Sequence, residues 1–412
     1  MNQAKHYRQK PLLVRLLLLA LFIAAPALLT EPLLAEPQRP ASDDTVVEHL
    51  PKQHRILAAN LAMPPLPENA NNLTHLDMEN TIIRAKHYLA LARQYADPRL
   101  LGFAQSSIAP WINTPTPATE LLVLQAMIKQ ADHQFQAALP YLNAALQQQP
   151  DHPQALLTRA AIQHVIGNYP AALTDCKRLV SRVATIISYT CIATTTGLSG
   201  QLAKSLSLLQ RIVNNMTDVN NAADVNPEQY QWVISSMADM AERLNQPALA
   251  AQYYQRAIAD QNTDNYVNEA YAEFLVQTEQ YQLLLQFCQQ SPSSDGLLVK
   301  QAFAEQQLNH ANASITVDLL KKRFARAQTR GDQKHLREQA YFYLHVLDTP
   351  EKALALSREN WSHQREPIDT LLYFKAAIQQ QDNQAIREIT HWVNASGFQD
   401  ARLDALINTQ TY

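Results

Sequence analysis

Glycine is scarce in this chain of 412 residues, which contains only seven, and aromatic residues make up only 7% of it. Tight β-hairpins and phosphate-binding loops depend on glycine because it adopts positive φ at little cost. Its scarcity, together with abundant alanine, leucine and glutamine, argues against a β-rich protein. Hydrophobic residues reach 47%, enough for a large core. The composition therefore predicts an all-helical protein.

Strong net charge and the common catalytic motifs are also missing. The formal net charge is −3, so no overall field favours nucleic acid or an anionic membrane. The sequence has no His-Glu-x-x-His motif, no cysteine pair two residues apart and no Gly-x-Ser-x-Gly elbow. Gly197 and Gly200 lack the lysine of a phosphate-binding loop. We therefore expect no metal, no cofactor, no nucleic-acid partner and no enzymatic activity.

What the sequence does contain is a repeated alanine. Successive copies are separated by 34, 34, 33, 45 and 34 residues, and twelve residues after each copy stands a second residue that is usually small. A fixed period in this range indicates a repeat array. The first set is Ala92, Ala126, Ala160, Ala193, Ala238 and Ala272, and the second is Ala104, Ala138, Ala172, Ser205, Ala250 and the larger Leu284.

The segment 119–150 contains one complete unit of this repeat. Its apolar and small residues recur every three or four positions in two stretches, as expected for two amphipathic helices joined by a turn at His133. Pro150 ends the unit because proline lacks the amide hydrogen of a helix interior. One hairpin cannot bury both of its apolar faces, so the units must stack. The pattern is carried by Leu122, Ala126, Lys129, Ala138, Leu142 and Ala145.

These positions resemble the motif of the tetratricopeptide repeat family. The resemblance implies an all-α fold, a right-handed α-solenoid of about eight or nine stacked antiparallel helical hairpins, with regular repeats in residues 79–290. Residues 291–412 follow the motif weakly, for example with Lys352 at a nominally small position. We expect degenerate helical hairpins there and a C-terminal capping helix.

The N-terminus has the pattern of a secretory signal peptide in residues 1–35. Basic residues precede an apolar run, Leu16–Ala25, of about ten residues, which is too short for a full membrane span. Cleavage after Ala27 and cleavage after Ala35 both fit the pattern. The alternative is an uncleaved membrane anchor formed by residues 12–30, which would be the only membrane contact.

Residues 36–78 are rich in proline, asparagine and acidic residues, a composition typical of an extended linker. An exported bacterial protein with this organisation would reside in the periplasm, or at the inner membrane if the anchor is retained. The repeats would then begin after the linker.

Cys176 and Cys191 lie almost symmetrically about a predicted turn near Val183. In two antiparallel helices they would stand at about the same height, so a disulfide is compatible with the spacing and with an oxidising compartment. The alternative is that each cysteine is a small apolar core residue. Cys288 would stay unpaired.

The family resemblance places certain first-helix positions on a concave groove. The early positions are apolar to neutral, whereas the later ones combine aromatic rings with carboxylates that could hold a basic or mixed peptide. An ordinary solvated helix face is the alternative. The groove residues implied are Met127, Gln130, Leu157, His164, Trp232, Asp239, Glu242, Tyr266, Glu269 and Glu273.

The resulting hypothesis is a non-enzymatic scaffold of the cell envelope that binds a protein or peptide in this groove. The competing hypothesis is a carbohydrate-handling scaffold for polysaccharide export or cell-wall assembly, in which exposed aromatic rings would matter more than carboxylates. An enzyme with an unrecognised site is the weakest alternative, because a regular solenoid lacks a deep pocket.

Overall fold

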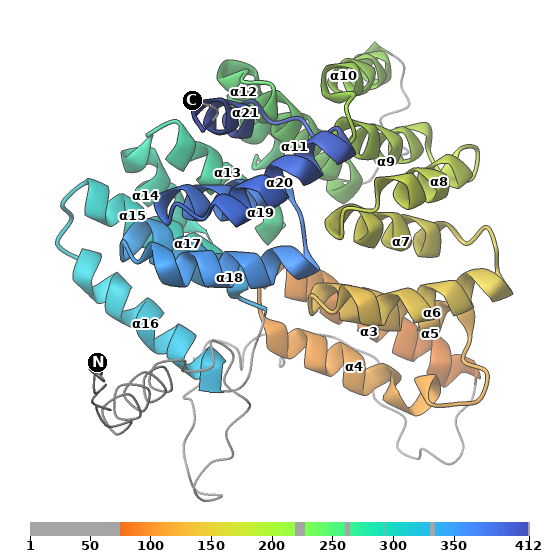
Figure 1. Cartoon of the computed structure of the whole chain (residues 1–412). Helices are drawn as coiled ribbons and strands as arrows, with labels where there is room; N and C mark the ends of the chain where they lie inside the picture. The colour runs from red at the N-terminus through yellow and green to blue at the C-terminus, as the bar shows by residue number, and fades with distance from the viewer. Residues whose placement is uncertain (1–74, 219–226, 260–263, 292, 330–333, 411–412) are drawn as a thin grey trace, which may run out of the picture.

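The computed structural model describes residues 75–218, 227–259, 264–291, 293–329 and 334–410. Within these ranges the chain is built of helices and has no β-strand (Figure 1), so the all-α prediction is confirmed. The predicted signal peptide lies outside the described residues, as does the linker up to residue 74. Residues 75–78, the predicted end of the linker, already belong to the first helix.

The described helices form nine consecutive antiparallel hairpins followed by one further helix, α21 (Ala401–Thr409). The first helices of the hairpins are α3 (His75–Tyr95), α5 (Thr119–Ala131), α7 (Pro153–Val165), α9 (Thr185–Gly197), α11 (Pro227–Arg243), α13 (Asn265–Gln277), α15 (Asp295–Gln307), α17 (Leu336–Tyr341) with the π-helical turn η2 (Phe342–Val346), and α19 (Pro367–Gln379). The second helices are α4 (Pro98–Ile112), α6 (Phe135–Gln148), α8 (Tyr169–Leu179), α10 (Leu202–Asp218), α12 (Pro247–Ala257), α14 (Tyr281–Gln290), α16 (Ala313–Thr329), α18 (Pro350–His363) and α20 (Asn383–Ser396).

The turn inside each hairpin contains one residue with positive φ. This conformation lets the next amide close the first helix, as where Gln134 N–H donates to the carbonyl of Lys129 at 2.8 Å. Only two of these residues are glycines, which explains how a glycine-poor chain makes so many tight turns. They are Ala96, His133, Gly167, Gly200, Asn245, Glu279, Asn309, Asp348 and Gln381, with φ between 49° and 91°.

The recurring alanines lie where the helices of a hairpin cross. Ala126, Ala138, Ala160 and Ala172 are all fully buried, which is the close approach that the sequence pattern predicts. A larger side chain at one of these positions would force the two helices apart, at a cost of about 1–3 kcal/mol. The close crossing of the two helices in a hairpin thus depends on small residues at these positions, and the sequence pattern identifies them.

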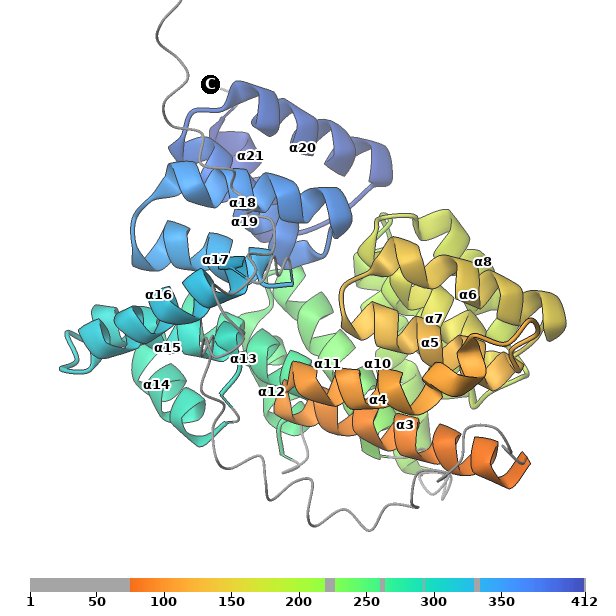
Figure 2. The same ribbon diagram turned by 90° about the horizontal axis from the view of Figure 1, so that it is seen from below.

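The first helices form a continuous layer along the array. Each contacts the first helix of the next hairpin, from α3 through α19. Because a curved array brings its elements closest together on the inside of the curve, this inner helix layer is the concave side, and the second helices lie outside it (Figure 2).

The C-terminal hairpins fold back against the turns of the N-terminal repeats, so the array closes on itself. Figure 1 shows α18 to α20 beside α7 and α11. We call this contact the seam. Along it, residues between Gln364 and Arg402 contact successive N-terminal hairpins, in the order in which both follow along the chain. Its polar contacts are Gln364 with His133 at 3.1 Å, Arg365 N–H to Val165 C=O at 2.6 Å, Leu202 N–H to Gln399 Oε1 at 3.1 Å, Arg243 Nη1 to Gln399 C=O at 3.3 Å, and Arg402 with Glu242.

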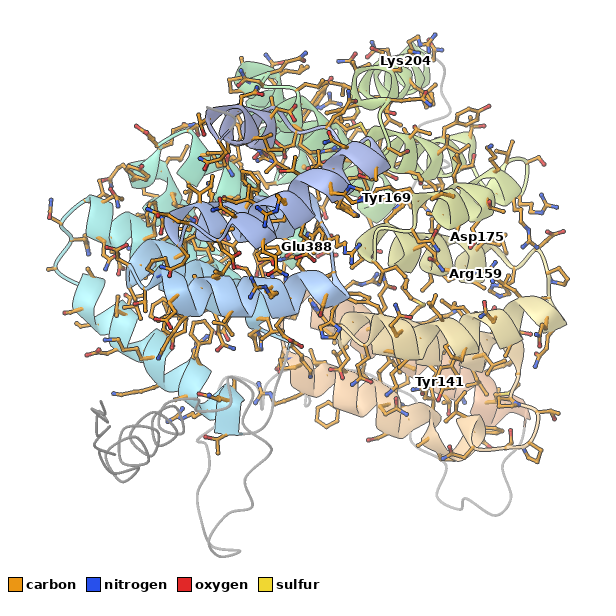
Figure 3. All side chains as sticks on the ribbon, in the orientation of Figure 1. Tyr141, Arg159, Tyr169, Asp175, Lys204 and Glu388 are labelled. Atoms are coloured by element: carbon orange, nitrogen blue, oxygen red, sulfur yellow. A yellow bond between two sulfur atoms is a disulfide. The ribbon has the colours of Figure 1, made fainter. Side chains whose placement is uncertain are left out.

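Aromatic rings pack across the same seam. Tyr169 at the start of α8 and Trp392 of α20 have ring centroids 6.4 Å apart, and Figure 3 shows Tyr169 between the α7–α8 hairpin and the C-terminal helices. At one point the packing is close enough to bring two backbones together, because a Cβ added to Gly200 would stand 3.5 Å from the carbonyl oxygen of Gly397. The seam therefore combines polar and apolar contacts.

A disulfide joins Cys176 of α8 to Cys191 of α9, with 5.4 Å between the Cα atoms. Both cysteines are buried, so the bond ties two adjacent hairpins together inside the core. Cys288 is a buried free thiol, and burial raises its pKa to about 12. Among the described residues no helix combines the length and the apolarity that a membrane span requires.

Candidate binding surface on the inner helix layer

All ten residues of the predicted groove lie on four helices of the inner layer. These helices are α5, α7, α11 and α13, which belong to the second, third, fifth and sixth described hairpins. The structure thus gathers the predicted residues on one layer, as the repeat pattern implies. Their surroundings differ, however, and these differences decide what each can contact.

The early residues are part of the packing between hairpins. Met127 and Leu157 are half-buried and pack against two adjoining hydrophobic clusters each, and Gln130 is also half-buried. His164 is hydrogen-bonded to the hydroxyl of Thr195 on α9, and burial lowers its pKa to about 4. At neutral pH the imidazole is therefore uncharged and serves to join two inner helices.

Trp232 of α11 is half-buried and packs against two hydrophobic clusters, one that includes its own hairpin and one formed by earlier hairpins. Its ring therefore links the early and middle repeats. An alanine at this position would remove core contacts as well as any contact with a partner. Trp232 is for this reason a poor position at which to test binding alone.

Two carboxylates of α11 are held by arginines of this chain. Asp239 pairs with Arg243, whose side chain is almost completely buried, at 2.9 Å. Glu242 pairs with Arg402 of α21 across the seam and accepts a hydrogen bond from the hydroxyl of Tyr254 at 2.8 Å. Burial raises the pKa of Glu242 to about 7, and the guanidinium of Arg402 limits that rise.

Glu273 of α13 lies 3.5 Å from the ammonium of Lys300 on α15 and accepts a hydrogen bond from Gln277 at 2.9 Å. Burial favours its neutral form, but the nearby ammonium groups of Lys300 and Lys375 outweigh it and hold the pKa of Glu273 below its ordinary value. This carboxylate is consequently ionised and buried, with its counter-charges supplied by later hairpins.

Glu269 is fixed by neutral donors. Its Oε1 accepts hydrogen bonds from the Ser294 hydroxyl at 2.6 Å and from the Asn265 side chain at 2.8 Å. Gly296 on the next first helix leaves room for this carboxylate, because a Cβ there would stand only 2.4 Å from its oxygen. A larger residue at this position would therefore displace the Glu269 carboxylate.

Tyr266 is the residue of the set with an accessible aromatic ring, with 59% of its surface exposed. Its hydroxyl donates a hydrogen bond to the carboxylate of Glu366 at 3.5 Å. Glu366 lies 100 positions further along the chain and is the N-cap of α19. Glu366 and Asp369 are both bound by Arg337 of α17. The negative charge of Glu366 raises the pKa of Tyr266 well above its ordinary value. The ring thus faces the inside of the curve.

Sequence reasoning missed the cations that accompany these carboxylates. Lys300, Arg337, Lys375 and Arg402 come from residues 291–412, which the motif describes poorly. Only Lys375 carried a signal in the sequence, because it interrupts the apolar run Leu371–Ile378. Most carboxylates of the inner layer are therefore neutralised by cations of this chain. The contact of the ten residues with a partner stays a prediction.

The fold defines the class of the protein as an α-solenoid of helical hairpins. The family model described as "Tetratricopeptide repeat" matches residues 123–185, which span α5 to the first residue of α9. In this segment the chain resembles the tetratricopeptide repeat proteins. Such proteins are generally non-catalytic scaffolds, and the fold suggests that this one acts in protein interactions.

Solved structures of the same kind resemble the chain only distantly. One is the APC/C hetero-tetramer Cut9–Hcn1, with 13% identity and a TM-score of 0.36, covering 74% of this chain and 51% of that one. Another is a tetratricopeptide repeat protein from Parabacteroides merdae, with 13% identity and a TM-score of 0.30, covering 72% of this chain and 98% of that one. This chain thus spans about half of the Cut9–Hcn1 chain that it matches. No curated protein matches the sequence.

Proposed function

We propose that this protein is a non-catalytic scaffold that binds a protein partner through the inner helix layer of its middle repeats. The observation that carries the proposal is the exposure of Tyr266. A large aromatic ring on the concave side of a repeat array offers area for contact with a partner, and its hydroxyl offers a hydrogen bond. Neighbouring carboxylates and arginines would orient a partner that carries both signs of charge.

We further propose that the protein works outside the cytoplasm, in the periplasm of a bacterium. The disulfide between Cys176 and Cys191 supports this location, because structural disulfides persist in oxidising compartments. The signal-peptide pattern of residues 1–35 points the same way. The scaffold would then organise an assembly of the cell envelope.

A crosslinking pull-down from native cells tests the proposed surface. The full chain and its Tyr266→Ala variant are expressed at equal levels, and the partners are identified by mass spectrometry. We expect one partner to be lost from the variant. Phe103→Ala is the matched control, because Phe103 is an aromatic residue of the α4 helix with 49% of its surface exposed, away from the inner layer.

If the variant and the wild type capture the same partners, the inner layer is not the binding surface. The salt dependence of the captured complex separates the two ligand classes. A protein partner held by charges should dissociate as salt rises, whereas a polysaccharide held by stacking on Tyr266 should change little. A polysaccharide recovered at high salt would replace the protein-binding proposal by the carbohydrate-handling one.

A further inference from the structure

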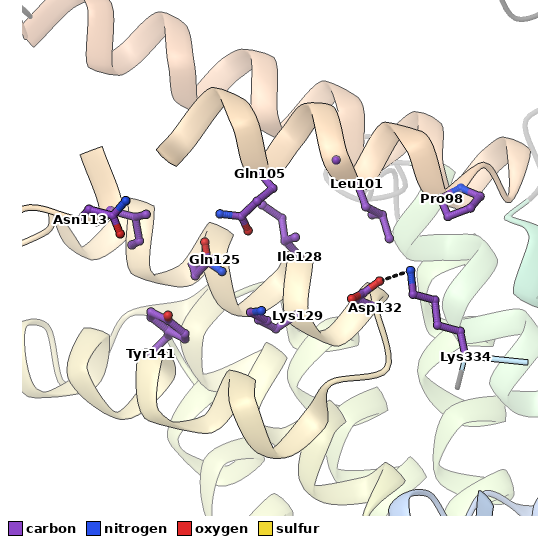
Figure 4. A pocket seen from close by; sticks show the side chains of 12 residues that line it. Pro98, Leu101, Gln105, Asn113, Gln125, Ile128, Lys129, Asp132, Tyr141 and Lys334 are labelled. Atoms are coloured by element: carbon purple, nitrogen blue, oxygen red, sulfur yellow. Dashed lines mark ion pairs between the residues drawn. The ribbon is translucent and has the colours of Figure 1, made fainter. Parts of the chain in front are cut away.

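A groove of about 490 Å³ opens on another part of the molecule, between α4 and the α5–α6 hairpin (Figure 4). Its lining extends along α4 from Pro98 to Asn113, the residue that follows this helix, and includes Gln125 of α5 and Tyr141 of α6. None of the ten residues predicted from the sequence belongs to it. The groove is thus separate from the inner-layer surface proposed above.

Gln125 is the most unusual residue of this groove. It is only 3% exposed, and its side-chain oxygen Oε1 has no hydrogen-bond partner among the described residues. A buried carbonyl without a partner is unfavourable for the free protein. Figure 4 shows the Gln125 side chain directed toward Gln105 on the opposite wall. A ligand in the groove that carries an N–H or O–H donor would satisfy this oxygen.

Gly102 keeps the α4 wall of the groove open. A Cβ added to it would meet no atom within 4 Å, so neither packing nor backbone conformation requires glycine here. Glycine inside a helix is destabilising by about 1 kcal/mol relative to alanine. Gly102 therefore makes α4 less stable than alanine would, and its missing side chain leaves free space along the groove.

The charged residues of the groove are Lys129, Asp132 and Lys334, and each is already bonded to another side chain of this protein. Asp132 forms an ion pair with Lys334 and accepts a hydrogen bond from Gln134, which in turn accepts one from Lys129 at 2.8 Å. The remainder of the lining is neutral. It consists of the amides Gln105, Asn113 and Gln125, the phenol of Tyr141 and apolar side chains, among them Leu101, Ile112 and Ile128.

The shape of the groove favours an extended chain. The α4 lining from Pro98 to Asn113 is about 22 Å long at 1.5 Å per residue. About six or seven extended residues would fit at roughly 3.3 Å each.

We propose that this groove binds an extended, uncharged peptide segment of a partner protein. A backbone N–H of the segment donates to Gln125 Oε1, and the amide of Gln105 faces the backbone from the other wall. A side-chain amide offers both a donor and an acceptor, as a peptide unit does, so neutral amides suit peptide backbone better than a charged ligand. Apolar side chains of the segment contact Leu101, Ile112 and Ile128.

The test uses the intact chain and an array of octapeptides composed only of alanine, valine, serine, threonine, asparagine and glutamine. The tightest binder is then titrated by fluorescence anisotropy. We expect an affinity that is the same at 50 and 500 mM NaCl. Gly102→Leu, which fills the groove, should weaken binding at least tenfold, whereas Ser106→Leu, at an exposed position of α4 outside the lining, should leave it unchanged.

The Gln125→Leu variant separates a binding role from a structural one. We expect it to lose at least tenfold in peptide affinity while its melting temperature stays the same or rises, because an unpaired buried oxygen has been removed. N-methylation of one backbone amide of the peptide should cause a similar loss in the wild type. A lower melting temperature of Gln125→Leu together with unchanged peptide affinity would overturn the proposal.

Two further results would also overturn it. One is the absence of any octapeptide that binds more tightly than 1 mM. The other is equal binding by the wild type and Gly102→Leu. Maltoheptaose and chitohexaose serve as competitors, and displacement of the peptide by either sugar would assign the groove to carbohydrate instead. Tyr266→Ala should leave peptide binding here intact, so failure of the inner-layer proposal and failure of this one are distinguishable.

Discussion

Reduction of the Cys176–Cys191 disulfide should destabilise the protein by a predictable amount. The bond closes a loop across a sequence separation of 15 residues. Closing a loop of about 15 residues restricts the unfolded chain by about 3 kcal/mol at 25 °C in the chain-entropy treatment. Both cysteines are buried, so in the folded protein the bond is protected from reductant until the α8–α9 region opens. The free energy of unfolding should therefore fall by about 3 kcal/mol.

Urea unfolding followed by circular dichroism measures this difference in the presence and absence of a phosphine reductant. Thiol titration of the unfolded protein verifies the two states, since the oxidised chain should show one thiol and the reduced chain three. The Cys288→Ala variant should keep its sensitivity to reductant, and a Cys176→Ala/Cys191→Ala double variant should have none. If reduction of the wild type changes its stability by less than about 1 kcal/mol, the loop argument is refuted.

Three other predictions concern buried charges. The folded-state pKa of Glu242 is raised to about 7 from 4.5, so the stability that this group gives at low pH is lost as pH rises to 7. Relative to Glu242→Gln, the wild type should lose about 3 kcal/mol between pH 4 and 8. Burial lowers the pKa of His164 to about 4 from 6.5, so this group destabilises the folded protein as pH falls. Relative to His164→Gln, the free energy of unfolding of the wild type should fall by about 3 kcal/mol between pH 7 and pH 4. Arg337→Met leaves Glu366 and Asp369 without their shared cation and should cost about 3–5 kcal/mol in urea unfolding at pH 7.

Comparison of wild type and variant over pH isolates each group, because all other titrations are common to the two proteins. Parallel stability curves for the wild type and Glu242→Gln would show that Glu242 titrates near its ordinary pKa. Parallel stability curves for the wild type and His164→Gln would show that the folded-state pKa of His164 is close to its ordinary value. For Arg337→Met, a loss below about 1 kcal/mol would mean that the two carboxylates are solvated.

Local sequence patterns were sufficient to predict the hairpins. Helix periodicity and the spacing of small residues depend on contacts between residues close in sequence, so the fully buried Ala126 and Ala138 were predictable one by one. The turn at His133 was equally local, since a positive-φ residue closes the preceding helix with a bond from the next amide. The equal heights of Cys176 and Cys191 follow from the antiparallel packing of α8 and α9 on either side of the short connection between them.

The partners of the charged residues could not be predicted in this way. Glu242 meets Arg402, and the Tyr266 hydroxyl meets Glu366, across separations of 160 and 100 residues. These long-range contacts depend on the curvature of the whole array, which is the sum of small rotations between successive hairpins. The groove lined by Gln125 has the same origin, because no motif marks the space between α4 and α6. The sequence by itself determined the repeating unit through short-range helix contacts, whereas the tertiary structure alone decided which surfaces the curved array covers and which it leaves open.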